Sequence, residues 1–200
     1  MQKTPYFPMP IVTDRLIIRP TQSPDGKIIN DAIIESFDEL HFWMEWADHM
    51  PSLEESEKYA KEAAQNWVDK KNDEPYLQLV ILDKNTGDFI GATSFHHYNW
   101  SVPSIETGYW VRKKCTGHGF MTEATNAITQ YAFKQLKVHR IALTCDPDNI
   151  KSKNIAERLG YTLEGRLKNH RRKPNSNALG ETLIYAKYVC ENLPLINITW

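Results

Sequence analysis

Residues 114–119, with the sequence KCTGHG, carry the first pattern in this chain that could do chemistry. Gly117 and Gly119 precede an amphipathic stretch from 120 to 136 that predicts a helix. Glycine lets the backbone approach a ligand closely, and the first amides of a helix have no intrahelical partners. Those amides also lie at the positive end of the helix dipole. The pattern therefore predicts either a cradle for a phosphate group or an ordinary strand-to-helix turn.

Two common phosphate-binding loops do not fit this turn. A P-loop requires Gly-Lys-Ser/Thr after four spacer residues, and the sequence contains no such string. A dinucleotide-binding fingerprint requires glycine or alanine at position 122, where this chain has Thr122. A phosphate bound at residues 114–119 would therefore belong to neither of these two classes of site.

A second motif follows the next predicted strand, where residues 149–161 read NIKSKNIAERLGY. Asn149 is a favoured N-cap, and Gly160 is typical of the position after a helix ends. Taken alone, the stretch indicates only a well-capped helix. In combination with the glycine turn it favours a second wall of one cofactor site.

The rest of the pattern predicts the elements that must position these motifs. Ser52 and Glu55 have the spacing of a capping box and begin one predicted helix. Strands are predicted at 13–19, 76–82, 89–97, 104–111, 139–145, 161–167 and 181–189, further helices at 24–40, 120–136 and 149–159, and a polar loop at 168–180. This order predicts a single domain over residues 1–200 of the α/β class, with helices on the faces of a mixed sheet.

Composition excludes several classes of protein. The chain has 200 residues, of which 41% are hydrophobic, and this suits one domain with a substantial core. A net charge of −1 gives no overall field for nucleic acid or an anionic membrane. The three cysteines lack paired spacing, residues 1–10 lack the apolar stretch of a signal peptide, and the apolar run at 79–82 is too short to span a bilayer. We therefore expect a soluble cytoplasmic protein without nucleic-acid or membrane partners.

Together these residues resemble the GCN5-related N-acetyltransferase (GNAT) superfamily, and in particular its ribosomal-protein (Rim-type) branch. The resemblance extends over most of the chain. Residues 13–20 (TDRLIIRP) are similar to the first strand of that branch, 43–46 (WMEW) to its W-L-P-W turn, 106–111 (ETGYWV) to its E-I-G-Y-W-L strand, 121–124 (MTEA) to its A-T-E-A, and 149–161 to N-x-x-S-x-x-I-A-x-x-L-G-Y/F. The resemblance implies the GNAT fold, a central, mostly antiparallel mixed sheet flanked by helices.

The resemblance also implies acetyl-CoA as co-substrate, with its pyrophosphate at the glycine turn. The amide of Val111 would hold the acetyl carbonyl, where its strand diverges from a neighbour. Lys114 and His118 depart from the residues usual in the family, so backbone amides should provide most of the phosphate contacts. The implied cofactor-binding residues are Trp110, Val111, Lys114, Thr116, Gly117, His118, Gly119, Phe120, Met121, Thr122, Asn149, Asn154 and Arg158.

Glu106 and Ser152 are the candidate catalytic residues. Glu106 shares a strand face with Gly108 and Trp110, so its carboxylate could face an acceptor amine and act as base. Because a free carboxyl has a low pKa of about 4.3, it would act through water unless burial raises that value. By resemblance, Ser152 lies near the sulfur and donates a hydrogen bond to the leaving thiolate. The alternatives are that Glu106 only attracts the amine or pairs with a lysine, and that Ser152 is an ordinary helix residue.

Two further groups of residues have side chains that could bind a metal or an amine. His96 and His97 could suggest a metal, but adjacent strand residues point to opposite faces and no cysteine or carboxylate has ligand spacing. We therefore expect no metal site. The aromatic residues Phe42, Trp43 and Trp46, with Glu45 and Asp48, would either line a groove for the amine or simply pack.

These patterns predict an N-acetyltransferase whose acceptor is the N-terminal amine of a protein, with a ribosomal protein favoured. Two alternatives stay open. One is a small-molecule amine such as a polyamine, an antibiotic or an amino-acid-like compound, and the other is a non-catalytic acyl-CoA-binding regulator. The oligomeric state is also open, with a homodimer as one alternative.

Overall fold

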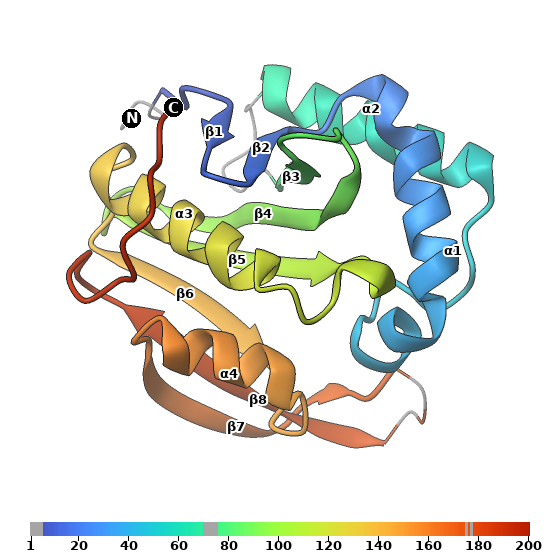
Figure 1. The fold of residues 1–200 in the computed structure, drawn as a ribbon. Helices are drawn as coiled ribbons and strands as arrows, with labels where there is room; N and C mark the ends of the chain where they lie inside the picture. The colour runs from blue at the N-terminus through green and yellow to red at the C-terminus, as the bar shows by residue number, and fades with distance from the viewer. Residues whose placement is uncertain (1–5, 70–75, 175, 177) are drawn as a thin grey trace.

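The computed structural model describes residues 6–69, 76–174, 176 and 178–200. Residues 1–5, half of the stretch judged for a signal peptide, lie outside the described residues. Within the described residues, eight strands form one sheet in the order β1-β2-β3-β4-β5-β6-β8-β7 (Figure 1). Strands β5 and β6 pair in parallel, and the other neighbouring pairs are antiparallel. The predicted mixed, mostly antiparallel sheet is confirmed.

The predicted order of elements is also confirmed. The strands are β1 (Ile11–Val12), β2 (Leu16–Pro20), β3 (Leu77–Asp83), β4 (Phe89–Asn99), β5 (Ser104–Val111), β6 (Arg140–Cys145), β7 (Thr162–Arg172) and β8 (Leu179–Lys187). The helices are α1 (Gly26–Trp43), α2 (Leu53–Asp69), α3 (Phe120–Lys134) and α4 (Ile150–Arg158), with short 3-10 turns at Ser23–Asp25 and Lys113–Cys115.

Local hydrogen bonds account for several of these boundaries. Ser52 and Glu55 form the predicted capping box, in which the backbone amide of each residue donates to the side chain of the other, at 2.8 and 3.2 Å. The predicted strand 13–19 is corrected at its start, because the Thr13 amide donates to the Leu16 carbonyl at 2.9 Å and makes a turn between β1 and β2.

The predicted loop at 168–180 is largely wrong. Strand β7 continues to Arg172, and β8 begins at Leu179, so the two strands form a long hairpin with Arg171 paired to Gly180. Most side chains of β7 are exposed, and this strand therefore lacks the apolar alternation by which strands are found in a sequence. Residues 175 and 177 of the predicted loop lie outside the described residues.

Helices cover both faces of the sheet (Figure 1). On one face α3 and α4 pack over a core that includes Leu79 and Tyr131, and on the other α1 and α2 pack over Val80 and Phe89. The alternation of Leu79 and Val80 between the two cores follows the two-residue period of a strand. Because β5 lies between the two helical layers, its side chains reach both.

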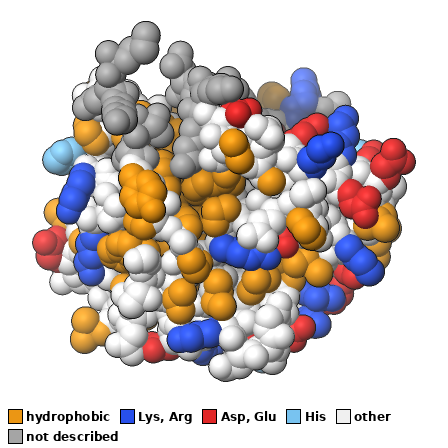
Figure 2. All heavy atoms as spheres, turned by 90° about the horizontal axis from the view of Figure 1, so that it is seen from above, with side chains coloured by type: hydrophobic (Ala, Val, Ile, Leu, Met, Phe, Trp, Pro, Cys, Tyr) orange, Lys and Arg blue, Asp and Glu red, His pale blue; other side chains and the backbone are white. Residues whose placement is uncertain are grey.

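The surface carries no single dominant charge on the face that Figure 2 displays, where acidic and basic side chains are interspersed among apolar ones. Within the described ranges, none of the helices combines the length and the apolar character that crossing a membrane would need.

Candidate active site

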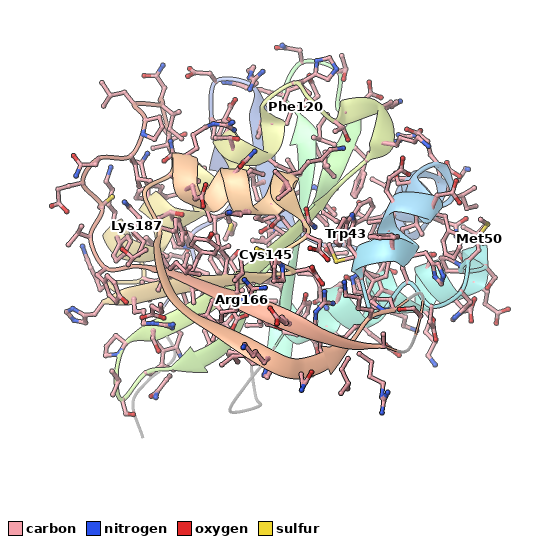
Figure 3. The ribbon with its side chains drawn as sticks, turned by 90° about the horizontal axis from the view of Figure 1, so that it is seen from below. Trp43, Met50, Phe120, Cys145, Arg166 and Lys187 are labelled. Atoms are coloured by element: carbon pink, nitrogen blue, oxygen red, sulfur yellow. The ribbon has the colours of Figure 1, made fainter. Side chains whose placement is uncertain are left out.

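A cleft opens where β5 leaves β6. The two strands pair only from Ser104 to Glu106 on β5, opposite residues 140–142, although β6 continues to Cys145 along β8. The divergence that the sequence predicted is therefore present. A cavity of about 810 Å³ fills the opening, and side chains from β4, β5, β6, α1 and α4 line it. Trp43 and Cys145, both labelled in Figure 3, line it from α1 and from β6.

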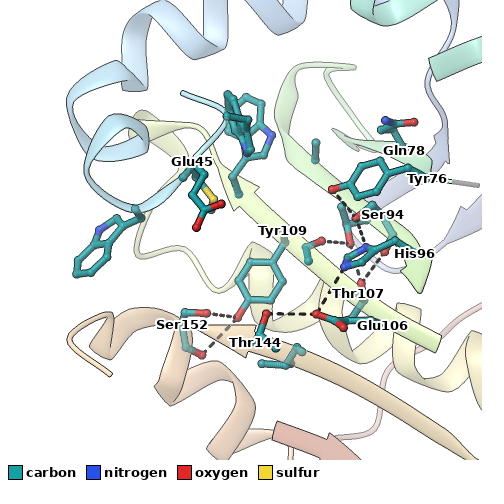
Figure 4. A pocket seen from close by; sticks show the side chains of 18 of the residues that line it. Glu45, Tyr76, Gln78, Ser94, His96, Glu106, Thr107, Tyr109, Thr144 and Ser152 are labelled. Atoms are coloured by element: carbon teal, nitrogen blue, oxygen red, sulfur yellow. Dashed lines mark hydrogen bonds and ion pairs between the residues drawn. The ribbon is translucent and has the colours of Figure 1, made fainter. Parts of the chain in front are cut away.

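A cluster of polar side chains forms the floor of this cleft (Figure 4). His97 Nδ1 lies 3.0 Å from Glu106 Oε2, and His96 Nε2 lies 3.7 Å from Glu106 Oε1. The Thr144 hydroxyl donates to the same Oε1 at 3.2 Å. These residues come from three neighbouring strands, and we call His96, His97 and Glu106 the floor triad.

The expectation that His96 and His97 point to opposite faces is wrong. The pairing of β4 with β5 shifts register between His96 and Asn99, and His97 has a left-handed backbone with φ of 48°. A bulge of this kind interrupts the alternation of a strand. Both imidazoles consequently reach the same carboxylate, which stands directly opposite His96 on β5.

The charge of Glu106 also differs from what burial alone would give. Burial raises the pKa of this carboxyl, but hydrogen bonds from His96 and His97, and the positive charge of these imidazoles in their protonated form, lower it to about 2. Glu106 is therefore ionised throughout the neutral range. A carboxylate of this kind is a weak direct base, which favours the alternative that Glu106 attracts the cationic amine.

The opposite wall of the cleft is built around the partly buried hydroxyl of Tyr109. The Tyr109 hydroxyl and Ser152 Oγ lie 3.0 Å apart, and the same hydroxyl donates to the Ser152 carbonyl at 3.3 Å. Burial raises the pKa of Tyr109, so its hydroxyl stays protonated. Cys145 also contacts Ser152, and burial raises the pKa of its thiol to about 11. Tyr109 and Ser152 thus offer two neutral donors in one place.

The backbone of β5 faces the gap between them. The Arg112 amide donates to the Ile90 carbonyl of the β4 side at 2.8 Å. Amides alternate in direction along a strand, so the Val111 amide points away from β4, toward the side that β6 has left. A donor in this position can hold a carbonyl oxygen in the gap.

The glycine turn lies at the start of α3. Gly119 is the N-cap of that helix with φ of 78°, and Gly117 has φ of 88°. These values belong to the left-handed region that only glycine adopts without strain. An added Cβ at Gly117 would meet no described atom within 4 Å, and one at Gly119 would meet only Arg15 Nη2, at 3.6 Å. The turn is open to solvent, as a ligand-binding turn requires.

Comparison with known proteins agrees with this arrangement. The family described as "Acetyltransferase (GNAT) domain" matches residues 15–162. The chain belongs to the GNAT acetyltransferase family. It is thus an N-acetyltransferase, and the resemblance noted in the sequence is confirmed.

Several similar proteins have names that state their substrates or ligands. The [ribosomal protein uS5]-alanine N-acetyltransferase of Escherichia coli is 28% identical over 166 residues, which cover 80% of this chain and 81% of the relative. The crystallised ribosomal L7/L12 α-N-protein acetyltransferase RimL, in complex with coenzyme A, matches with a TM-score of 0.78 and 20% identity over 90% of this chain and 98% of its own. The microcin C7 self-immunity acetyltransferase MccE, in complex with acetyl-CoA and AMP, gives a TM-score of 0.78 and 22% identity, over 88% and 93%.

The structure divides the predicted site residues of this GNAT chain into two groups. Glu106, Trp110, Asn149 and Ser152 line the cleft. The other predicted cofactor residues are not among those that line the cleft. They are Val111 at the end of β5, and Lys114, Thr116, Gly117, His118, Gly119, Phe120, Met121, Thr122, Asn154 and Arg158 around the start of α3 and on α4.

Contacts within the second group connect the two helices. Arg158 Nη1 donates to the Thr122 hydroxyl at 3.1 Å, so α4 and the first turn of α3 adjoin. Met121 is buried, whereas Lys114 and Asn154 are exposed. The side chain of Asn149 accepts a hydrogen bond from the Ser152 amide at 3.1 Å, as an N-cap does, and also lines the cleft.

The aromatic stretch after α1 contributes to one wall. Trp43, Glu45 and Trp46 line the cleft, and the Trp46 ring lies 6.1 Å from that of Trp110. Phe42 packs on Trp43 with its ring largely exposed, and Asp48 lies in an adjoining hollow that also borders Glu106.

Sequence reasoning missed the side chain of Tyr109 and the approach of His96, His97 and Thr144 to Glu106. It also missed Arg15, which donates to the His118 carbonyl at 3.0 Å and pairs with Glu123 at 2.6 Å. Tyr109 could have been found, because it lies within the same motif as Trp110 and Val111. No sequence signal marks the bulge at His97.

Proposed function

We propose that this GNAT chain transfers the acetyl group of acetyl-CoA directly to the N-terminal amine of a protein, with ribosomal proteins as the acceptor class. The names of the relatives support this choice, because the uS5-alanine and L7/L12 enzymes act on ribosomal proteins. The structure of MccE with acetyl-CoA and that of RimL with coenzyme A support the co-substrate.

Different residues of the site can bind each part of acetyl-CoA. The pyrophosphate meets the amides of the glycine turn and the positive end of α3. The pantetheine arm passes between β5 and α4, beside Asn149 and Ser152. The acetyl carbonyl reaches the Val111 amide in the gap between β5 and β6. This divergence of two strands is the observation that carries the proposal, because it exposes a backbone donor beside the cleft.

The chemistry follows from the two walls. The ionised Glu106 attracts the acceptor amine in its cationic form, and the neighbouring imidazole of His97 accepts the proton that the amine must lose. The amine nitrogen then attacks the thioester carbon, and the Val111 amide stabilises the oxyanion. The carbon–sulfur bond breaks as the carbonyl reforms, and the Tyr109 and Ser152 hydroxyls stabilise the leaving thiolate by hydrogen bonds while staying protonated themselves.

One observation favours a small-molecule amine as a second candidate acceptor. The cleft measures about 810 Å³, within the range of about 300–1,000 Å³ that is usual for small-molecule sites. Trp43 and Trp46 would then pack against the apolar part of the compound, and Glu45 would attract its amine.

A panel of acceptors tests the proposal. Purified protein is incubated with acetyl-CoA and synthetic peptides that carry the N-termini of ribosomal proteins, and the acetylated product is located by tandem mass spectrometry. Matched peptides with a blocked N-terminus and one internal lysine are the control. We expect the free N-terminus to be acetylated and the blocked peptides to stay unmodified. Turnover of polyamines or aminoglycosides alone would favour the second candidate, and tight acetyl-CoA binding without turnover of any acceptor would show a non-catalytic regulator.

A further inference from the structure

The floor triad has the chemistry of a metal site as well as that of a proton relay. Two imidazoles and one carboxylate are ligands that zinc and similar divalent transition metals prefer. One ligand atom from each of His96, His97 and Glu106 lies within 4.8 Å of the others. Tetrahedral zinc with bonds of about 2.1 Å holds its ligand atoms about 3.4 Å apart. His97 Nδ1 lies 3.0 Å from Glu106 Oε2, and His96 Nε2 lies 3.7 Å from Oε1, so a metal between the two imidazoles faces both oxygens of the carboxylate.

The hydrogen bonds behind the triad prepare His96 to be a ligand. Ser94 donates its only hydroxyl proton to the Tyr76 hydroxyl at 3.1 Å, and Ser94 Oγ lies 3.1 Å from His96 Nδ1. The serine oxygen must therefore accept a proton from Nδ1. A neutral His96 then has its lone pair on Nε2, directed at the carboxylate of Glu106. A cation placed between these two electron-rich atoms, either a proton or a metal, would be stabilised by both of them.

Neighbouring groups hold the other parts of the triad in place. The His96 ring stacks on Tyr76, with centroids 5.0 Å apart, and only 13% of its side chain is exposed. The Thr144 hydroxyl donates to Glu106 Oε1 at 3.2 Å. Such outer contacts orient ligands and typically matter 10- to 100-fold for metal affinity. His97, whose side chain is 64% exposed, is free to adjust by the few tenths of an ångström that a metal requires.

We propose that His96, His97 and Glu106 bind one divalent cation of the zinc type at the floor of the cleft, and that the bound cation inhibits acetyl transfer. The binding part stands on the geometry of the triad. The inhibitory part rests on the proposed function, because the same lone pairs and the same carboxylate would serve the acceptor amine. A cation bound to the two imidazoles and the carboxylate leaves no base to accept a proton from the amine and no free negative charge to attract it.

Titration of the metal alone tests binding. Zinc chloride is titrated calorimetrically into full-length protein that has been stripped with a chelator, without any coenzyme present. We expect one equivalent to bind, and we expect His96→Ala and His97→Ala each to weaken binding at least ~10-fold. His139→Ala removes an exposed histidine that does not line the cleft, and it should leave the affinity unchanged. Absence of binding, or binding that both triad variants leave intact, would overturn the proposal.

Cobalt provides a second measurement that does not depend on heats. Tetrahedral Co²⁺ at the triad should give visible absorption bands that disappear in His97→Ala, and acetyl-CoA affinity equal to that of the wild type shows that the variant is folded. Bands that persist in the variant would place the metal elsewhere.

Inhibition is measured on the acetylated peptide by mass spectrometry, because the free thiol of released coenzyme A would itself bind zinc. We expect zinc to suppress turnover of the wild type at the concentration that fills the site, in competition with the amine, and a chelator to restore it. Zinc that fills the triad without changing turnover would overturn the inhibitory role. A stripped enzyme with no turnover on any acceptor would count against the proposed function, while the titration would still decide the metal site.

Discussion

The glycine turn before α3 follows strand β5, and the floor of the cleft includes a side chain of the same strand. The turn offers backbone groups to a ligand, whereas the floor offers side chains. The turn offers backbone amides, and its special residues, Gly117 and Gly119, act through their dihedral angles. The floor offers side chains from three strands, brought together by a bulge. The turn should therefore tolerate changes of side chain and fail when its backbone changes, and the floor should behave in the opposite way.

Glu106→Gln is the most damaging change we expect. The amide keeps the size of the side chain but removes the charge that holds the amine and pairs with His97. The change also removes the carboxylate that orients His97, and a general base of this kind typically contributes about 100- to 10,000-fold. We therefore expect turnover to fall at least ~100-fold while acetyl-CoA affinity is unchanged. Steady-state kinetics and calorimetry measure the two quantities. Because the pKa of Glu106 is lowered to about 2, an acid limb of the wild-type pH–rate profile near neutrality belongs to another group and should persist in the variant. Loss of that limb would identify Glu106 as the titrating base.

Gly119→Val tests the turn. Valine at a φ of 78° strains the backbone by roughly 1–2 kcal/mol and moves the first amides of α3, so we expect acetyl-CoA affinity to fall about 30-fold. Gly87→Val is the matched control, because Gly87 has a φ of 75° in the open turn between β3 and β4. It should lose similar stability and keep its affinity. Equal affinity in the two variants would remove the pyrophosphate from the turn.

The charge of the floor should also appear in the acid stability of the protein. A carboxyl with a lowered pKa stabilises the fold above its ordinary pKa, and this contribution is lost as the pH falls through that value toward the lowered one. Between pH ~4.5 and ~2 we therefore expect the wild type to lose on the order of 2 kcal/mol of unfolding free energy that Glu106→Gln does not lose. Chemical denaturation at a series of pH values measures the difference. Parallel curves for the two proteins would contradict the ion pairs of the floor.

Tyr109→Phe removes one of the two donors beside Ser152. Since Ser152 remains, we expect turnover to fall about 10-fold and the KM for acetyl-CoA to change less than ~2-fold. Tyr161→Phe is the control, because its buried hydroxyl bonds Thr129 at 2.6 Å inside the core. That change should cost about 1 kcal/mol of stability and leave turnover intact. Equal turnover in both variants would indicate that Ser152 alone stabilises the leaving thiolate.

Lys114→Ala should have the smallest effect. The side chain is exposed, and the Lys114 amide is held by Glu35 Oε1 at 3.0 Å whatever the side chain is. We expect acetyl-CoA affinity to change less than ~3-fold, with the difference disappearing at high salt. A loss above ~10-fold would make this lysine a principal phosphate ligand and would weaken the contrast between backbone and side-chain sites.

The same contrast explains what the sequence could predict. Gly117 and Gly119 were recognisable because the demand for glycine is local, and the capping box of Ser52 and Glu55 is local too. The convergence of His96 and His97 was not recognisable, because the two-residue period of a strand holds only until a bulge interrupts it. The lowered pKa of Glu106 likewise depends on residues of a neighbouring strand. The extension of β7 to Arg172 was not predicted for a related reason. The backbone pairing of a strand needs no apolar pattern, and the side chains of β7 are mostly polar.

The contacts of Arg15 affect which mutations can alter acceptor selectivity without disturbing the glycine turn. From the turn between β1 and β2 it donates to the His118 carbonyl, pairs with Glu123 and lies 4.7 Å from the centre of the Phe120 ring. Arg15 thus fastens the turn to the edge of the sheet formed by β1 and β2, several strands away from β6. Helix α1 holds the segment before the turn, because Glu35 accepts from the Lys114 amide at 3.0 Å and Glu39 pairs with Lys113 at 3.0 Å. On the proposed binding mode, mutations in β6 that refit the cleft to a new amine leave the turn unchanged, whereas mutations in α1 act on both. We therefore expect a new acceptor selectivity to be engineered through β6 with less effect on coenzyme binding than through α1.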